Sequence, residues 1–458
     1  MTVEEKNVAL AVPDNPLPSS RNLGNYLSGI DQPDEEKWAD CVHCGMCLEA
    51  CPTYQELGQE HQSPRGRVHL IKAVAEGKIA LDEAFEDPVF TCLDCRACET
   101  ACPANVQVGG LIEEARGQAR HAMPLTGWQA SMKKLFLNGI FPHPSRLHKL
   151  GGTLSFLQKS GLETFARRMG LLKVLPEHLQ DMEKAMPQVG QPIMKKYAEV
   201  IPAEGETKQR VAMLTGCIMD VMFSDVNEAT VRVLTRNGYE VMLPREQRCC
   251  GALHVHAGDR NEGKRLAKQN IEAFREADTV LVNAAGCGCA MQEYPELFQD
   301  DPEWKEKAES FSAKVVDVSK FLVDHGYRKP RAELKQRVTY HDACHLAHGQ
   351  GVRAEPRQLL KDIPGVEMVD LPDADRCCGS AGIYNLTHPE MAGALLERKI
   401  DDVPEDVEMI SMGNPGCMLQ IAMGVKRHGR SEKVVHTMQL LDWAYEKEES
   451  GEGAKPHV

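Results

Sequence analysis

Eight of the 17 cysteines fall into two runs of identical spacing, and nothing else in the sequence restricts the fold as strongly. Each run has the pattern C-x2-C-x2-C-x3-C followed by proline: Cys41, Cys44, Cys47 and Cys51 before Pro52, then Cys92, Cys95, Cys98 and Cys102 before Pro103. Three closely spaced thiolates can hold one corner of a cubane, and the proline then turns the backbone away. The spacing therefore predicts two [4Fe–4S] clusters.

The pattern also predicts how the ligands are shared. It is that of two-cluster bacterial ferredoxins, in which the fourth cysteine of each run ligates the other cluster. One cluster is therefore expected on Cys41, Cys44, Cys47 and Cys102, and the second on Cys92, Cys95, Cys98 and Cys51. The 40 residues between the runs include VHLIKAVAEGKIALDEAFED, whose apolar spacing is helical, which indicates an α-helical ferredoxin domain.

Two structural zinc sites of four cysteines each are the alternative, because zinc also accepts thiolates. Such sites usually pair two C-x2-C knuckles, and they need neither a third cysteine nor the Cys-Pro that occurs here twice. Iron–sulfur ligation is the better interpretation of the two runs.

Charge and hydropathy exclude other classes of protein. The net charge of −14 leaves no basic excess to meet phosphate, so no nucleic-acid partner is expected. The sequence has no apolar stretch near the ~20 residues that span a bilayer, and its acidic N-terminus lacks a secretory layout. We expect a cytoplasmic protein, in which clustered cysteines bind metal or do chemistry rather than form disulfides.

The 458 residues are too many for one core, and changes along the sequence indicate several domains. The predicted class is α+β and multidomain. The expected segments are a polar N-terminal arm (1–30), the ferredoxin domain (31–123), a basic amphipathic helical connector (124–209), two α/β modules (210–331 and 332–446) and a disordered tail (447–458).

The α/β part contains an internal repeat. In each half a cysteine ends a strand-like run, a Cys-Cys-Gly follows, and a Gly-Cys ends another strand: Cys217, Cys249, Cys250 and Cys287, then Cys344, Cys377, Cys378 and Cys417. The offsets are 127 residues from Cys217 to Cys344, 128 from Cys249 to Cys377 and 130 from Cys287 to Cys417. The repeat predicts duplicated modules placed about a pseudo-twofold axis.

Each Cys-Cys-Gly module offers four thiols, and strand-end loops at one edge of an α/β sheet commonly gather ligands. We predict that one or both modules bind metal or an additional iron–sulfur cluster. Buried cysteines acting as small hydrophobes, a vicinal disulfide, or a decayed duplicate are the competing interpretations. His254, His256, His341 and His345 lie near these cysteines; ordinary hydrogen bonding is their expected role, with proton delivery to a quinone or tuning of a thiolate as alternatives.

Taken together, these motifs resemble a known family. The runs CVHCGMCLEACPTYQ, SPRGR, TCLDCRACETACP, RCCGALHVH, AAGCGC and RCCGSAGIYNLTHPE are similar to those of iron–sulfur subunits of bacterial glycolate oxidase. More widely, the chain resembles the Cys-Cys-Gly family, whose members include one of the subunits of anaerobic glycerol-3-phosphate dehydrogenase, lactate-utilisation proteins and heterodisulfide reductase subunits. The similarity covers roughly residues 38–445.

The resemblance implies an electron-transfer subunit. FAD-containing partner subunits in a hetero-oligomer would oxidise a 2-hydroxy acid, glycolate above all, and electrons would pass through this chain toward a quinone at the membrane surface. The sequence has no dinucleotide fingerprint, P-loop or nucleophile elbow, so the chain is not expected to oxidise the substrate alone and no catalytic residue is assigned. A peripheral position on the cytoplasmic face of the membrane follows from the same resemblance.

One departure weakens a second interpretation, a catalytic disulfide or quinone reductase of the heterodisulfide reductase type. In that form each module ends in C-x-x-C. Here the first ends in Cys287-Gly288-Cys289, and the second continues from Cys417 to Gln420 without another cysteine. A zinc-stabilised scaffold is the third hypothesis.

The connector suggests a docking surface. Between Pro124 and Pro176 the only acidic residue is Glu163, while eight lysines and arginines occur among apolar and aromatic residues at roughly helical spacing. Short basic amphipathic helices suit an in-plane membrane contact. Packing against the modules or a flavin subunit is the alternative, and is slightly favoured.

Overall fold

The computed structural model describes residues 23–174 and 176–450, so most of the expected N-terminal arm and of the tail lies outside the described residues. The cysteine-rich N-terminal part is helical, as predicted. Its helices are α1 (Pro52–Leu57), α2 (Pro64–Ala75), α3 (Glu83–Thr91), α4 (Ala97–Thr100) and α5 (Val108–Ala122). Ser63 caps α2 by accepting a hydrogen bond from the Gly66 N–H, with Pro64 at the first helical position. Ile71 of α2 packs with Leu111 and Ile112 of α5, all three fully buried.

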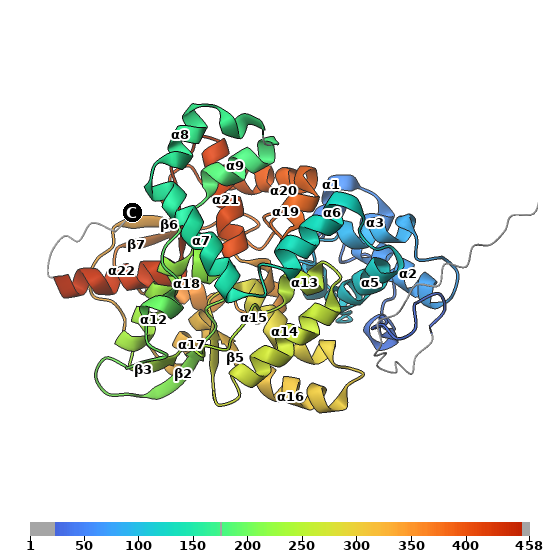
Figure 1. Cartoon of the computed structure of the whole chain (residues 1–458), viewed down its shortest axis with the longest axis horizontal. Coiled ribbons are helices and arrows are strands. Elements are labelled where there is room, and N and C mark those ends of the chain that lie inside the picture. The colour runs from blue at the N-terminus through green and yellow to red at the C-terminus, as the bar shows by residue number, and fades with distance from the viewer. Residues whose placement is uncertain (1–22, 175, 451–458) are drawn as a thin grey trace, which may run out of the picture.

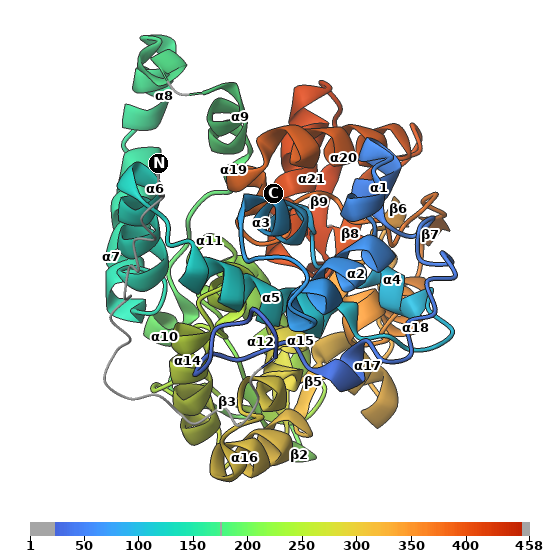
Figure 2. The same cartoon turned by 90° about the vertical axis from the view of Figure 1, so that its right-hand side faces the viewer.

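The connector is a chain of helices along one side of the molecule. They are α6 (Gly127–Met132), a π-helical turn (Lys133–Asn138), α7 (Pro144–Lys159), α8 (Leu162–Arg168), α9 (Glu177–Ala185) and α10 (Ile193–Lys196). Figure 2 shows α6, α7 and α8 along one edge, with α8 extending away from the body. On α7 only Leu147 and Gly151 are buried, so most of this helix faces outward.

The first sheet has the order β1-β3-β2-β4-β5. Its strands are β1 (Val200–Ile201), β2 (Gln209–Met213), β3 (Tyr239–Met242), β4 (Val280–Val282) and β5 (Val315–Asp317). All neighbouring pairs are parallel except β1 with β3. The helices of this part are α11 (Ile218–Met222), α12 (Ser224–Arg236), α13 (Ala252–His256), α14 (Arg260–Ala273), α15 (Ala285–Gln292), α16 (Pro302–Ser312) and α17 (Val318–His325). Because helices cover the sheet, strand β4 is buried throughout.

The second sheet repeats this topology as β7-β6-β8-β9, with every pair parallel. Its strands are β6 (Gln336–Tyr340), β7 (Val366–Val369), β8 (Met409–Met412) and β9 (Lys433–His436). Its helices are α18 (Ala354–Lys361), α19 (Tyr384–Thr387), α20 (Pro389–Asp401), α21 (Pro415–Arg427) and α22 (Thr437–Ser450). Helix α22 includes residues 447–450, so this part of the predicted disordered tail is helical.

The two sheets share their hydrophobic cores, since residues of both contribute to the same buried clusters. At the strand ends, the Ala285 N–H donates to the Gly413 carbonyl at 3.0 Å. At the opposite side, Arg232 and Arg236 of α12 pair with the fully buried Asp442 of α22 at 2.5 and 2.7 Å. Figure 1 shows the ferredoxin-like helices on the right and the two sheets at the centre and left.

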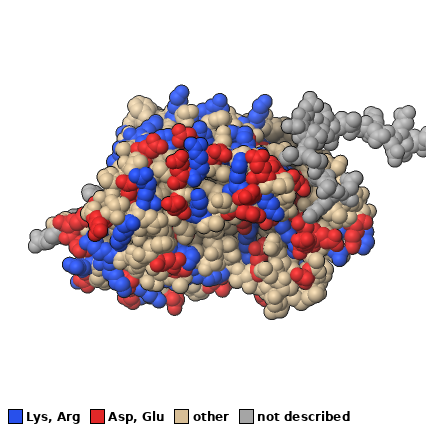
Figure 3. Space-filling view, turned by 90° about the horizontal axis from the view of Figure 1, so that it is seen from below, with Lys and Arg blue, Asp and Glu red and all other residues tan. Residues whose placement is uncertain are grey.

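Charged side chains of both signs are intermingled on one face of the molecule (Figure 3). On the face shown in Figure 3, Lys and Arg side chains lie among Asp and Glu side chains. Within the described residues, no helix combines the length and apolar character that a bilayer-spanning segment requires.

Candidate functional site

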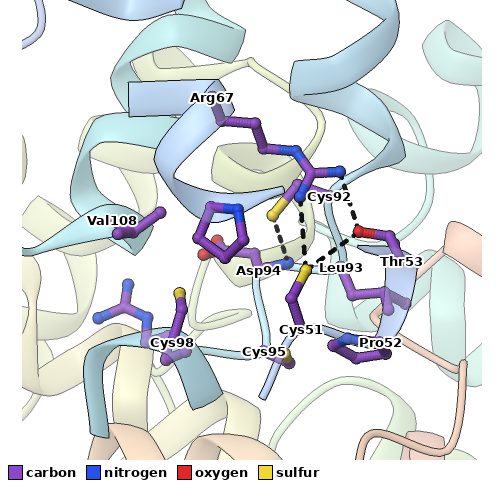
Figure 4. Close-up of a pocket in the computed structure, with 12 residues that line it drawn as sticks. Cys51, Pro52, Thr53, Arg67, Cys92, Leu93, Asp94, Cys95, Cys98 and Val108 are labelled. Carbon is purple, nitrogen blue, oxygen red and sulfur yellow. Dashed lines mark hydrogen bonds between the residues drawn. The ribbon is translucent and has the colours of Figure 1, made fainter. Parts of the chain in front are cut away.

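Four of the predicted cluster ligands line one pocket in the ferredoxin-like part. Cys92, Cys95 and Cys98 of the second run meet Cys51 of the first around one small pocket. Figure 4 shows the Cys51 sulfur between the loop that carries Cys92 and Cys95 and the start of α1. The set is the one predicted by the crossed-ligand rule, because the chain turns at Cys51-Pro52 and delivers that thiol to the neighbouring site.

A buried arginine, not assigned by the sequence interpretation, lies over this pocket. Arg67 is 1% exposed, and its guanidinium donates to the Cys51 sulfur at 3.8 Å and to the Thr53 hydroxyl at 3.0 Å. It also donates to the Gln62 side chain at 2.9 Å and the Pro88 carbonyl at 2.7 Å. The SPRGR run, which ends at Arg67, is the sequence feature from which this arginine could have been predicted as part of the site.

The donor set fits an iron–sulfur cluster. Burial raises the pKa of Cys92, Cys95 and Cys98, so thiolates need compensation there. The nearby cations Arg67 and Arg116 partly oppose the effect of burial on the pKa of Cys92, because a positive charge stabilises the thiolate. Four thiols facing one cavity, with cations beside them, match a thiolate-held cluster of net negative charge.

The first run lies at the surface. Cys44 is exposed, Cys41 and Cys47 are half-buried, and the neighbouring Val42 and Met46 are 78% and 60% exposed. Arg65, the other arginine of SPRGR, donates to the His43 carbonyl of this loop at 3.1 Å. Cys102 packs on the same hydrophobic cluster as Cys41. The two predicted clusters would thus lie in different environments, one exposed and one enclosed.

The Cys-Cys-Gly thiols gather where each sheet changes winding direction. In the first sheet β2 lies between β3 and β4, so the loops that follow β2 and β4 diverge and leave a crevice. Cys217 follows β2, the Cys249-Cys250 pair follows β3, and Cys287 follows β4. In the second sheet the corresponding residues follow β6, β7 and β8: Cys344, Cys377, Cys378 and Cys417.

Within each module the four thiols form a continuous series of contacts. The Cys217 thiol donates to the Cys249 sulfur at 3.5 Å, and side-chain hydrogen bonds continue from Cys249 to Cys250 and from Cys250 to Cys287. The same series runs through the second module: Cys344, Cys377, Cys378 and Cys417. Four neighbouring thiols, buried in the second module and buried or half-buried in the first, suit a metal or iron–sulfur centre far better than isolated packing roles.

The glycine of each Cys-Cys-Gly allows the tight turn after the cysteine pair. Gly251 and Gly379 have φ values of 90° and 87°, which side chains with a Cβ rarely adopt. A Cβ on Gly379 would also lie 2.6 Å from the Ala392 carbonyl oxygen. The glycines therefore allow packing against the following helix.

Cys289 lies apart from the thiol series of its module. It is buried, and its charged neighbours are Glu293, Arg96 and Glu113 at the boundary with the ferredoxin-like part. Residues two apart on a helix face different directions, so Cys287 and Cys289 of α15 do not serve one site. The C-x-C spacing, in place of C-x-x-C, thus leaves the first module without a second thiol from the helix that carries Cys287.

The enclosed ferredoxin pocket adjoins the second module. Cys95 shares a buried cluster with Cys344 and Cys377, and burial together with the adjacent Cys344 thiol raises the pKa of Cys95. The Tyr384 hydroxyl donates to the Thr91 carbonyl at 2.8 Å across this boundary. Two thiol sets are therefore in contact through packed side chains.

Comparison with known proteins gives the same order of parts. The 4Fe–4S dicluster domain matches residues 37–106, the glycolate oxidase iron–sulfur subunit linker region matches 128–186, and the cysteine-rich domain matches twice, at 211–292 and 338–422. The probable glycolate oxidase iron–sulfur subunit of Bacillus subtilis (strain 168) is 45% identical over 417 residues, covering 89% of this chain and 94% of that protein. The chain belongs to the glycolate oxidase iron–sulfur subunit family.

Other relatives agree with this family. The glycolate oxidase iron–sulfur subunit of Escherichia coli (strain K12) is 32% identical over 89% of this chain and 94% of that protein. One of the subunits of the fumarate reductase (CoM/CoB) of Methanothermobacter marburgensis is 28% identical over 93% of this chain and 78% of that protein. Iron–sulfur binding and membership of an oxidoreductase complex therefore hold for this chain.

In this member of the glycolate oxidase iron–sulfur subunit family, a buried charge cluster joins the three cysteine-bearing parts. His256 of the first module lies 3.1 Å from Asp94 and 3.3 Å from Glu113. Burial alone would lower the pKa of His256, but these carboxylates raise it to about 9. Its ring lies 5.4 Å from that of His345, whose pKa burial lowers to about 3.

The remaining histidines near the Cys-Cys-Gly motifs differ from one another. His254 makes the ordinary hydrogen bond expected, from its ring to the Leu137 carbonyl at 2.7 Å. His345 contacts the neighbouring Cys344 thiol at 3.5 Å. His341 lies within 4.8 Å of the sulfurs of Cys378 and Cys417. The position of the four histidines near the cysteines could be read from the sequence, but their different contacts depend on tertiary structure.

Proposed function

We propose that this chain is the electron-transfer subunit of a flavin-dependent glycolate dehydrogenase, passing electrons from FAD on partner subunits toward a quinone acceptor. The single observation that carries the proposal is the continuity of the thiol sets, from the exposed first run through the enclosed pocket to the second module. An electron carrier needs this sequence of sites; a zinc scaffold has no use for it.

We propose the ligands as predicted from the sequence. The exposed site takes Cys41, Cys44, Cys47 and Cys102, and the enclosed site takes Cys92, Cys95, Cys98 and Cys51. When bound, [4Fe–4S] clusters supply one-electron transfer, which a chain of amino acids lacks. The protein's contribution is to hold the thiolates, to supply the Arg67 and Arg116 charges beside the enclosed set, and to exclude water there.

An additional centre in the Cys-Cys-Gly modules is part of the proposal. The eight thiols would hold it or lie at the electron exit: Cys217, Cys249, Cys250, Cys287, Cys344, Cys377, Cys378 and Cys417. A pseudo-twofold relation of the modules is supported by the common strand order and by the contact between Ala285 and Gly413, which follow corresponding strands. The domain limits given above belong to the same proposal.

The exposed first run is proposed as the electron entry. Val42 and Met46 flank the cluster loop and are the exposed apolar residues on which an electron-donating partner could dock. Entry at this end places the modules at the exit, in agreement with the contact between the enclosed pocket and Cys344.

The connector helices are proposed as a second contact with a partner subunit. Trp128, Phe156, Phe165 and Met169 are 76%, 64%, 58% and 63% exposed, an unusual concentration of apolar surface. Two of the basic residues that suggested a membrane contact are neutralised within the chain: Lys133 pairs with Asp259 at 3.2 Å, and Arg167 with Glu183 at 2.8 Å. Partner packing is therefore favoured over a membrane surface.

Anaerobic co-expression with a flavoprotein subunit tests the proposal. The assembled complex should oxidise glycolate with an artificial dye, and EPR should show clusters in this chain being reduced by glycolate. The isolated chain should show neither, because it carries no flavin. Turnover by the isolated, flavin-free chain, or clusters that glycolate leaves oxidised in an active complex, would contradict the proposal.

A further inference from the structure

His341 occupies an unusual position beside the thiols of the second module. It directly follows strand β6 and is fully buried, with 0% exposure. One of its ring nitrogens lies within 4.8 Å of the sulfurs of Cys378 and Cys417, which are themselves buried and lie within 4.8 Å of each other. Three potential ligand atoms therefore converge on one small space.

Neither ring nitrogen of His341 has a hydrogen-bond partner of acceptable geometry among the described residues. A neutral imidazole has one N–H and one nitrogen with a free lone pair. Leaving a buried donor or acceptor unpaired is unfavourable. A bound metal atom would satisfy this lone pair and is chemically suited to it.

The first module has no counterpart. At the repeat offset of 127 residues, His341 corresponds to Leu214, which is buried and apolar. Gly413 and Asn414 approach the thiol site from the next strand, and the Asn414 amide donates to the Cys417 sulfur at 3.4 Å. The two modules therefore share four thiols, but only the second has an imidazole at the residue that directly follows the strand before its first cysteine.

The position where heterodisulfide-type modules have their last cysteine does not supply a ligand here. Gln420 is buried and its side chain is already paired, accepting from the Asn385 amide at 3.0 Å and donating to the Ala392 carbonyl at 3.3 Å. The additional donor of the second module is therefore His341, which precedes Cys344, and not a residue that follows Cys417.

Positive charge lies on the same side of the site. Lys399 of α20 is fully buried and donates to the Asp373 carbonyl at 2.5 Å, close to the thiols of Cys377 and Cys378. Arg357 is held by the Asp342 carboxylate at 2.6 Å. A centre with four thiolates would carry excess negative charge, which the buried lysine offsets and to which a neutral nitrogen ligand adds nothing.

From this geometry we infer that His341 is a nitrogen ligand of the metal centre in the second module, together with Cys344, Cys377, Cys378 and Cys417. The first module then holds its centre by thiols alone. The inference rests on the proposed function in one respect, namely that the second module binds an iron–sulfur centre.

Pulsed EPR of the full-length, anaerobically purified protein tests the assignment. With histidine labelled by ¹⁵N, a directly bound imidazole gives a strong nitrogen hyperfine coupling, whereas a hydrogen bond to a ligand sulfur gives only a weak one. We expect a strong coupling in the wild type and its loss in His341→Gln. In His341→Cys we expect the metal to be retained and the nitrogen coupling to be lost.

His436→Gln is the matched control. His436 is also buried in the second module, but both of its nitrogens are paired, one with the Asn283 carbonyl at 2.9 Å and one with the Met438 N–H at 3.1 Å. This variant should keep the strong coupling. A second control, His345→Gln, removes the imidazole beside Cys344 and should also keep it.

Metal analysis separates the two ways of failing. The ligand assignment alone would be overturned if the protein holds more than the eight irons of two [4Fe–4S] clusters but the nitrogen coupling is only weak. The same holds if the coupling is strong but persists in His341→Gln. Eight irons and no other metal would overturn both the assignment and the proposed centre in the module.

Discussion

Replacing Arg67 with glutamine removes the cation next to the enclosed cluster site, and we expect the reduction potential of that cluster to fall. The guanidinium lies 3.8 Å from the Cys51 sulfur and is 1% exposed, so solvent does little to screen it. Reduction adds an electron to the cluster, and a nearby positive charge stabilises the reduced form more than the oxidised form. Without it, reduction becomes harder.

The size of the shift follows from the distance. Two unit charges 3.8 Å apart interact by about 4.4 kcal/mol at an effective dielectric constant of about 20. For a one-electron couple a tenfold change in equilibrium is about 59 mV, so the upper limit is about 190 mV. Because the added electron is spread over the cluster behind the sulfur, about half of this, ~100 mV, is the expected downward shift.

The assay is an anaerobic redox titration followed by EPR, with iron content measured on the same samples. Arg67 also holds Thr53, Gln62 and Pro88, so Arg67→Lys serves as the variant that keeps the charge but loses the forked hydrogen bonds. It should shift the potential far less than Arg67→Gln.

Arg65→Gln is the matched control from the same motif. Arg65 pairs with Glu60 at 2.6 Å on the exposed side, away from the enclosed pocket. It should leave the potential of the enclosed cluster in place. If Arg67→Gln retains its iron and its potential equals that of the wild type, the electrostatic argument is wrong.

Three further outcomes are expected. Cys102→Ser should perturb the cluster of the exposed Cys41–Cys47 run and leave its neighbour intact in EPR spectra; loss of the neighbour alone would refute the crossed assignment. His256 has its pKa raised from 6.5 to about 9, so it contributes stability, roughly 3 kcal/mol, that is complete below pH 6.5 and is lost as the pH rises toward 9; denaturant unfolding at several pH values should show this decline in the wild type and not in His256→Gln. Replacing Phe156 and Phe165 by Ser should release the partner subunit in co-purification without changing iron content. If the variant complex still assembles, and the wild-type complex floats with anionic vesicles in a salt-sensitive way, the connector contacts the membrane instead.

The sequence predicted the elements whose patterns are local. The helical spacing between the two cysteine runs corresponds to α2 and α3. The short β-rich runs RVAMLTGC, TVLVNAAGC, RVTYHDAC, VEMVDLP and EMISMGNPGC predict strands, and they correspond to β2, β4, β6, β7 and β8. Strands β1, β3, β5 and β9 were not identified. VI of β1 is only two residues long and lies in the predicted helical connector, VVD and KVVH are short and border polar residues, and YEVM is only four residues long. Their place in the sheet depends on partners far along the chain.

The candidate site was predictable in its ligands and not in its surroundings. Repeated spacing identified the thiols, because ligand geometry imposes it on the sequence. Nothing local distinguishes Arg67 from Arg65, since two residues within one helix turn differ in burial only after α2 packs on its neighbours. His341 and His254 likewise differ through tertiary contacts, the first facing thiols and the second a carbonyl of the connector.

The contrast between the two cysteine runs bears on how the protein survives in air. Oxidation of cluster sulfurs and loss of iron require access by oxygen, and susceptibility follows exposure. Cys44 of the proposed exposed site is exposed, while Cys51 and Cys95 of the proposed enclosed site are buried, so a cluster at the exposed site should be destroyed first. A docked electron-donating partner would cover the same loop, so assembly would also protect this cluster. Chains without a partner would then lose the cluster at the exposed site before any other.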